Sequence, residues 1–138
     1  RPAAGPIYSN AVLDVSRLAG DWQQVAGFGP GCQATGRASI APGASGLRIG
    51  YDLCQAGVMV TAAGGMQPVG PGRFAVPGQP GPWWVLWADA DYRTLVIGTP
   101  DGSLGFILNR GAFPSDRLVA AKDILDWNGY DLGQLTVY

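Results

Sequence analysis

Apolar residues along most of the chain fall into short runs separated by turn residues. Several runs alternate between apolar and polar side chains, which is the period of a half-buried strand. The pattern predicts eight strands, over residues 21–28, 33–40, 47–54, 58–63, 72–76, 83–89, 94–99 and 104–110. The links between them are short and rich in Gly and Pro, which favours hairpins and therefore antiparallel pairing.

The last part of the chain has a different period. Leu118, Ala121 and Leu125 recur at helical spacing, which predicts an α-helix with one apolar face over residues 115–128. Ser115 is the expected N-cap, because its hydroxyl can accept a hydrogen bond from a free backbone N–H of the first turn.

The two ends of the chain complete the predicted domain. Residues 1–11 contain two prolines and no period, and we expect them to form an arm wrapped over the domain. Residues 132–138 are predicted to form a short ninth strand. A length of 138 residues fits one domain with one core. The fold class predicted for residues 1–138 is all-β: an eight-stranded antiparallel up-and-down β-barrel with the helix packed outside.

Composition excludes several classes of function. The sequence has no His and no Glu, and Lys122 is its only Lys, so it has no His-based nucleophile pair and no His zinc ligand. A net charge of −1 excludes the basic surface that nucleic-acid binding requires. No apolar run approaches the ~20 residues of a membrane helix. We expect neither a metal nor a cofactor, and no enzymatic activity.

Three short motifs occur in a fixed order along the chain. Gly20 and Trp22 form a G-x-W sequence at the start of the first predicted strand. Asp91 and Tyr92 end a D-A-D-Y turn that resembles a T-D-Y turn, with alanine in place of the usual threonine. Arg110 ends the last barrel strand. Together with the terminal helix, these motifs make nearly the whole chain similar to the lipocalin family, in its bacterial and apolipoprotein D-like branch.

The motif residues are expected to be structural. Trp22 points inward at the base of the first strand, and in a closed barrel the last strand brings Arg110 beside it. A guanidinium on an indole face gains a cation–π energy of ~0.5–2 kcal/mol, and its remaining donors can bind loop carbonyls. We therefore expect Gly20, Trp22 and Arg110 to hold the closed end of the barrel without touching a ligand. Asp89 and Asp91 are interpreted as turn carboxylates rather than a Ca²⁺ site.

Alternation predicts which side chains face the barrel interior. The strand that ends at Arg110 carries Leu104, Phe106 and Leu108 on the same face. The strand over residues 83–89 is apolar on both faces, so alternation alone leaves its orientation open.

The resemblance to lipocalins favours Trp83, Val85 and Trp87 as inward residues, with Trp84 outside beneath the helix. On the same analogy, the inward residues of the neighbouring strands are Phe74, Val76, Val96 and Gly98. Phe28 is expected to be a lid residue of a flexible loop over the mouth. The residues predicted to contact a ligand are Phe106, Trp87, Trp83, Phe74, Leu104, Val85, Val76, Tyr51 and Phe28.

The polar candidates for the interior are few. They are Gln24, Arg48 and Tyr51, and the parity of their strand places Arg48 and Tyr51 on opposite faces. At most one of these two points inward unless a bulge intervenes, so ionic capture of a head group has weak support.

Cys32 and Cys54 are the two cysteines of the chain. With the turn between the second and third predicted strands centred near Gly43, each lies eleven residues from the centre, so the two positions face each other. Cross-strand Cβ separations of ~4.5–5.5 Å can relax to disulfide geometry. We predict a Cys32–Cys54 disulfide, which fits an oxidising compartment.

The resemblance implies that the protein binds and carries or stores a small hydrophobic ligand of the fatty acid or lysophospholipid class in the barrel cavity. It also implies a place in the cell envelope (periplasm or outer membrane) or secretion. The chain begins with Arg1 rather than Met. Removal of a signal peptide would explain this, and so would another trimming of the chain. The branch's usual lipid-anchor cysteine is not in this chain, which leaves open whether the protein is anchored to a membrane or soluble. Two alternatives remain: a filled barrel that serves as a structural or protein-interaction module, and an enzyme built on the barrel.

Overall fold

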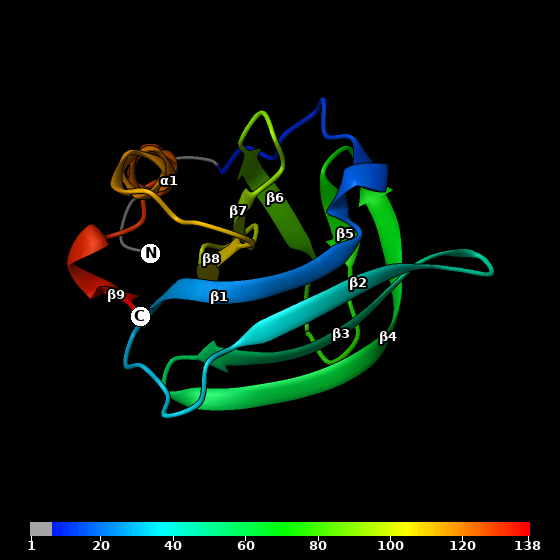
Figure 1. The fold of residues 1–138 in the computed structure, drawn as a ribbon, viewed down its shortest axis with the longest axis horizontal. Helices are drawn as coiled ribbons and strands as arrows, with labels where there is room; N and C mark the ends of the chain where they lie inside the picture. Colours follow the sequence, from blue (N-terminus) through cyan, green and yellow to red (C-terminus); the bar gives the residue numbers. More distant parts are fainter. Residues whose placement is uncertain (1–6) are drawn as a thin grey trace.

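A computed structural model describes residues 7–138, which fold into one antiparallel barrel with a helix against its outside (Figure 1). The strands are β1 (Gly20–Phe28), β2 (Arg37–Gly43), β3 (Gly46–Gln55), β4 (Val58–Gly70), β5 (Arg73–Ala75), β6 (Trp83–Ala88), β7 (Thr94–Gly98), β8 (Gly105–Asn109) and β9 (Leu135–Val137). Their order in the sheet is β2-β3-β4-β5-β6-β7-β8-β1-β9, and an additional pairing of β1 with β2 closes eight of them into a barrel. The predicted fold class is confirmed.

Strand β1 is the seam at which the barrel closes. Its first residues pair with β2, from Gly20 opposite Ile40 to Gln23 opposite Arg37. From Gln23 onward it pairs with β8, with a bulge between Gln24 and Ala26. The end of β1 also pairs with β9, which therefore lies outside the closed barrel.

Three helical segments accompany the barrel: η1 (Val15–Leu18), α1 (Ser115–Trp127) and η2 (Leu132–Gln134). The N-cap of α1 is Pro114, with extended backbone angles and no side-chain hydrogen bond, so the prediction of Ser115 as N-cap was wrong. The carbonyl of Pro114 instead accepts the N–H groups of Arg117 and Leu118, at 3.1 and 3.2 Å. Within residues 7–138, the helices are too short or too polar to cross a bilayer.

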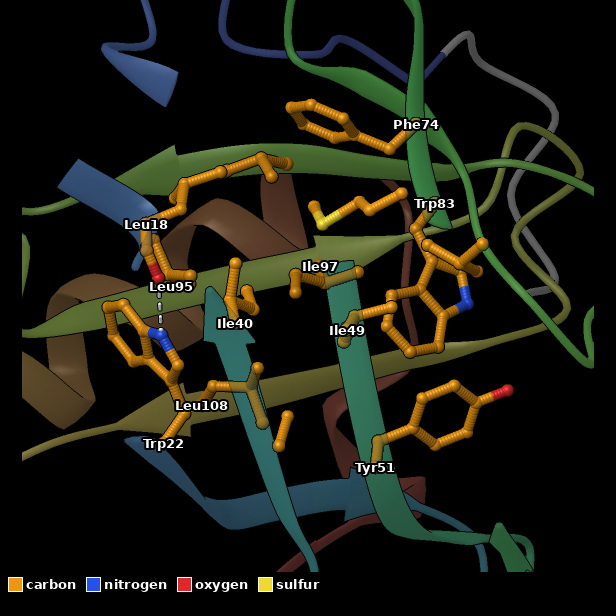
Figure 2. Close-up of a cluster of buried hydrophobic side chains, with 14 of the residues drawn as sticks. Leu18, Trp22, Ile40, Ile49, Tyr51, Phe74, Trp83, Leu95, Ile97 and Leu108 are labelled. Atoms are coloured by element: carbon orange, nitrogen blue, oxygen red, sulfur yellow. Dashed lines mark hydrogen bonds between the residues drawn. The ribbon is translucent and has the colours of Figure 1, made fainter. Parts of the chain in front are cut away.

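The apolar residues divide into two cores. The larger one fills the barrel, where Trp22 and Leu18 lie toward one end and Tyr51 and Trp83 toward the other (Figure 2). The second core lies between α1 and the outer face of the sheet, where Ala121 packs with residues of β6, β7 and β8. The helix therefore covers the barrel wall without entering the barrel.

Two predicted strands have bounds that differ by three or more residues from those in the structure. β2 begins at Arg37 rather than residue 33, because the chain before it forms a loop. β4 runs on to Gly70 rather than ending at residue 63, since its pairing with β3 continues to Met66 opposite Leu47. Gly64 belongs to this extension, where a Cβ would approach Pro77 to 3.2 Å.

The segments at the two ends follow the prediction in part. Residues 1–6 of the predicted arm lie outside the described residues. The rest of the arm packs on the domain: Ile7 is buried, and the N–H of Asn10 donates to the Val85 carbonyl at 2.7 Å. The predicted ninth strand is confined to β9 and follows η2.

Cys32 and Cys54 form a disulfide, with their Cα atoms 5.9 Å apart. The predicted bond is present, but the cross-strand register predicted for it was wrong. The β2–β3 hairpin pairs Gly43 with Gly46, so its centre lies between residues 44 and 45. Cys32 therefore belongs to the loop between β1 and β2, and the disulfide ties that loop to the end of β3.

Removal of this disulfide should destabilise the protein substantially. The bond joins residues 22 positions apart, and the chain-entropy model gives about 3 kcal/mol for a loop of this size. We expect the Cys32→Ser/Cys54→Ala variant to lose that amount in urea unfolding. Reduction of the wild type should shift its curve by a similar amount and leave the variant unchanged. Two free thiols in the unfolded, unreduced wild type would contradict the prediction.

Candidate functional site

The end of the barrel at which β1 begins is closed by Arg110. Its guanidinium lies 4.0 Å from the centre of the Trp22 ring. It donates hydrogen bonds to the carbonyls of Ala19 and Arg17, each at 2.7 Å, and to that of Tyr92 at 2.8 Å. Burial lowers the pKa of Arg110 from its ordinary value. The predicted cation–π pair is present, and it joins η1, β1 and the end of β8.

The turn between β6 and β7 completes the closed end. Asp89 accepts hydrogen bonds from the N–H groups of Arg93 and Thr94, at 2.6 and 2.7 Å, as expected of a turn carboxylate. The Tyr92 hydroxyl accepts the N–H of Asp14 at 2.7 Å, while Asp91 is exposed. Among residues 7–138, no group of three or more His, Cys, Asp or Glu side chains is placed to hold a metal ion.

The opposite end contains a cavity of about 480 Å³. Four segments surround it: the end of β1, the β3–β4 turn, the β5–β6 loop and the β7–β8 loop. Its lining residues are Phe28, Gln55, Ala56, Gln79, Pro80, Gly81, Pro82, Thr99, Pro100, Asp101, Ser103, Leu104 and Gly105. This cavity is the candidate binding site.

Aromatic side chains fill the barrel interior. The ring of Trp83 lies 5.1 Å from that of Phe106 and 5.1 Å from that of Tyr51, measured between centroids. All three residues are buried in the core that fills the barrel. Figure 2 shows Tyr51 and Trp83 side by side, far from Trp22 at the closed end. The open-end cavity is therefore a cup at the mouth of a barrel whose lower part is packed.

The predicted ligand-contacting residues occupy three kinds of position: the wall of the open-end cavity, the packed interior and, for Trp87 alone, the outer face of the barrel. Phe28 and Leu104 line the open-end cavity. Six others face the interior and are buried in its core: Tyr51, Phe74, Val76, Trp83, Val85 and Phe106. Phe74 also lines a separate cavity of about 370 Å³ near η1 and the β2–β3 hairpin.

Trp87 faces outward, so its predicted orientation was wrong. The register of β6 with β7 shifts between Val85 and Trp87, which marks a bulge. The bulge reverses the alternation, so Trp87 packs with Leu86 in the core beneath α1. The prediction for β7 was also wrong, because Val96 belongs to that outer core while Leu95 and Ile97 face the interior.

Gly98 shares the outward face of Val96. A Cβ at this position would lie 2.6 Å from the Tyr130 hydroxyl and 3.0 Å from Leu86, both of which belong to the outer core. Gly98 was predicted to face the interior, but it instead lets Tyr130 approach the outer wall.

Phe28 forms a fixed part of the rim. Its ring stacks on that of Tyr130, with the centroids 4.9 Å apart, and the Tyr130 hydroxyl donates to the Leu104 carbonyl at 2.7 Å. Phe28 is the last residue of β1 rather than part of a flexible loop, and these contacts tie it to the helix-side core. Its role as a lid stays a prediction.

The β5–β6 loop is fastened over the interior by Tyr51. The Tyr51 hydroxyl donates to the Pro77 carbonyl at 2.6 Å and accepts from Gln79 Nε2 at 3.0 Å. A Cβ at Gly78, whose φ is +73°, would lie 3.0 Å from that hydroxyl, so the loop approaches the barrel closely. Sequence reasoning treated this loop as a simple link. The signal in the sequence was the alternation that can place Tyr51 inside the barrel, because a buried hydroxyl needs a hydrogen-bond partner at the mouth.

Polar groups at the cavity are few. Gln55 Nε2 is buried and has no hydrogen-bond partner among the described residues, and the same holds for the indole nitrogen of Trp83. Asp101 Oδ1 accepts hydrogen bonds from Thr99 Oγ1 at 2.9 Å, Ser103 N at 3.0 Å and Ser103 Oγ at 2.7 Å. Hydrogen bonds from Ser103 and then Thr99 lower the pKa of Asp101 to about 2.

Comparisons with known proteins agree with this architecture. Residues 71–138 match the family model of a lipocalin-like domain. The major allergen Per a 4 from cockroaches has a TM-score of 0.69 at 13% identity, covering 98% of this chain and 92% of that chain. Insecticyanin from the tobacco hornworm Manduca sexta has a TM-score of 0.68 at 15% identity, covering 99% and 84%.

A third solved structure, that of the siderocalin Ex-FABP, has a TM-score of 0.64 at 16% identity, covering 88% of this chain and 93% of that chain. No curated protein sequence matches the chain. At such low identities the structural likeness establishes the fold, which is that of the lipocalins. The family model adds that the second half of the chain is similar to lipocalins in sequence.

Loss of Arg110 should weaken the fold. We expect Arg110→Ala to lower the free energy of unfolding by about 1–3 kcal/mol, because the cation–π contact and three hydrogen bonds to carbonyls are lost together. Urea unfolding followed by circular dichroism measures the effect. Arg48→Ala is the matched control, since Arg48 is exposed on the outside of β3, and it should change stability by less than about 0.5 kcal/mol. Equal stability of the two variants would contradict the structural role of Arg110.

Proposed function

We propose that the protein binds and carries, or stores, a small hydrophobic ligand at the open end of its barrel. The observation that carries this proposal is the cavity of about 480 Å³ between Phe28, Pro82 and Leu104. Its volume is within the ~300–1,000 Å³ range of small-molecule sites, and most of its lining is apolar. We expect the apolar part of a ligand to lie against these three side chains.

The ligand class that fits best is a single-chain lipid, such as a fatty acid or a lysophospholipid. Such a chain presents a narrow apolar tail to the cup and leaves its polar end at the rim. The aromatic floor of Trp83, Tyr51 and Phe106 limits how far the tail can enter unless these side chains change rotamer. We propose contacts with these floor residues for the deepest part of the tail.

A second candidate function is a filled barrel that serves as a structural or protein-interaction module. The close packing of Trp83 between Tyr51 and Phe106 favours it. An enzyme has weaker support. It would be favoured by a buried Asp with a raised pKa at the cavity, whereas Asp101 is exposed and hydrogen bonds hold its pKa at about 2.

We also propose a site of action in the cell envelope or outside the cell. The Cys32–Cys54 disulfide supports an oxidising compartment, because cytosolic reductants keep most thiols reduced. Membership of the bacterial and apolipoprotein D-like branch is part of the same proposal and rests on the sequence motifs.

Binding should appear as saturable quenching of tryptophan fluorescence. We expect fatty acids and lysophospholipids to quench Trp83, which lies next to the lining residue Pro82 in the chain. Each methylene buried stabilises by ~0.8 kcal/mol, so affinity should rise about fourfold per carbon until the cavity is full. Protein stripped of lipid by organic extraction is the sample. A lack of saturable quenching with every chain length would leave the filled-barrel module as the better function.

Two leucines provide a matched pair of variants for this experiment. Leu104 lines the open-end cavity, whereas Leu47 lines the cavity near η1, and both are half-buried against the same core. We expect Leu104→Asn to weaken lipid binding at least tenfold and Leu47→Asn to leave it unchanged. Thermal unfolding of both variants separates lost binding from lost structure.

A further inference from the structure

The open-end cavity carries a negative charge. Among the described residues that line it, Asp101 is the only one with a formal charge. A smaller adjoining cavity of about 230 Å³ shares Phe28 and Ser103 with it and is lined by a second carboxylate, Asp131. The described lining of both cavities contains no Lys and no Arg.

The Asp101 charge is fixed in position. Its Oδ1 accepts three hydrogen bonds from the ends of its own loop, two from Ser103 and one from Thr99. These donors stabilise the ionised carboxylate, so Asp101 stays negative throughout the physiological pH range. The loop therefore presents a constant negative charge beside any ligand in the cup.

The basic residues of the described chain lie away from this mouth. Arg110 closes the other end on Trp22, Arg17 lies over Tyr92 in the closed-end turn, and Arg73 lies over Trp84 on the outer wall. The remaining basic residues among those described are Arg37, Arg48, Arg93, Arg117 and Lys122. None of these residues lines either mouth cavity, so the described chain places no cation in the wall of either cavity to pair with an anionic head group.

The cavity does offer groups for an uncharged polar ligand. The buried amide nitrogen of Gln55 has no partner among the described residues, and a buried polar group without a partner is costly. The indole N–H of Trp83 also has no partner among the described residues, but Trp83 is buried in the barrel interior and does not line the cavity. In Figure 2 its nitrogen points to the same side as the Tyr51 hydroxyl, which bonds to the cavity residue Gln79. If the Gln55 amide turned toward the cavity, it could donate to a hydroxyl or ester oxygen of a ligand.

We propose that the open end selects single-chain amphiphiles whose polar end is cationic or uncharged, and that it discriminates against a free carboxylate. This inference rests on the proposed function and deepens it. Within the proposed ligand class, it favours a lysophospholipid whose outermost group is a cation over a fatty acid. Asp101 is the residue that sets the preference.

Three probes with the same tail test the inference at mildly alkaline pH: dodecyltrimethylammonium and dodecanoate below their micelle concentrations, and 1-dodecanol below its solubility limit. We expect the cation to bind roughly three- to tenfold more tightly than dodecanoate, with the alcohol between them, since exposed charges interact weakly in water. Added salt should reduce the difference, because it screens exposed charges over ~10 Å or less. This salt comparison needs no variant.

The Asp101→Asn variant isolates the charge. The amide oxygen of Asn can still accept the hydrogen bonds from Thr99 and Ser103, so the loop should keep its shape. We expect the ratio of cation to carboxylate affinity to fall toward one. Asp21→Asn makes the same change in net charge at the closed end, where Asp21 accepts a hydrogen bond from Ser39 at 2.6 Å, and should leave the ratio unchanged.

The outcomes separate this inference from the function beneath it. If none of the three probes binds, the proposed function is wrong and the inference falls with it. If all bind but dodecanoate binds as tightly as the cation, the function stands and the inference is wrong. If Asp101→Asn and Asp21→Asn change the ratio of cation to carboxylate affinity equally, the preference arises from net charge, and the role proposed for Asp101 is wrong.

Discussion

Closure of the barrel depends on β1, because this single strand pairs with β2 on one side and β8 on the other. Its pairing with β2 extends only to Gln23, so toward the open end another contact has to join β1 to the β2–β3 side of the barrel. The buried side chain of Gln24 does this: its amide donates to the Cys54 carbonyl at 2.9 Å and accepts the Cys54 N–H at 2.8 Å. The Gln24 side chain thus joins β1 to β3 beyond the last residue of β1 that pairs with β2. Position 36 is Gly because any Cβ there would overlap the Gln24 amide.

The same region explains why the disulfide lies at the mouth. Cys54 receives the Gln24 amide on its backbone and the Cys32 sulfur on its side chain, so one residue anchors both β1 and the loop that follows it. At the closed end, Arg110 joins three segments through carbonyls and the Trp22 ring. The two ends are therefore held by different interactions, and the open end leaves room for a cavity between its loops.

The packed floor and the charged rim together define the site. Trp83 and Phe106 pack against each other in the barrel interior below the mouth, which leaves the cup above them as the space for a ligand. The polar part of a ligand must then lie among the loops, near Asp101 and Gln55. Under the proposed function, the apolar cup supplies the binding energy and the charge of the rim affects the choice of head group.

The sequence by itself determined the number and order of the strands, the helix, the closed-end residues Trp22 and Arg110, and the partners of the disulfide. The strands and the helix follow from short-range periodicity and turn chemistry, the closed-end residues from motifs, and the disulfide partners from the presence of only two cysteines. Only the tertiary structure decided the orientation of Trp87 and the pinning of the β5–β6 loop by Tyr51. A bulge shifts the alternation by one residue, and both faces of β6 are apolar, so no local pattern reveals it. The packing of the interior likewise depends on side chains that are distant in sequence, such as Tyr51, Trp83 and Phe106, and meet only after the barrel closes.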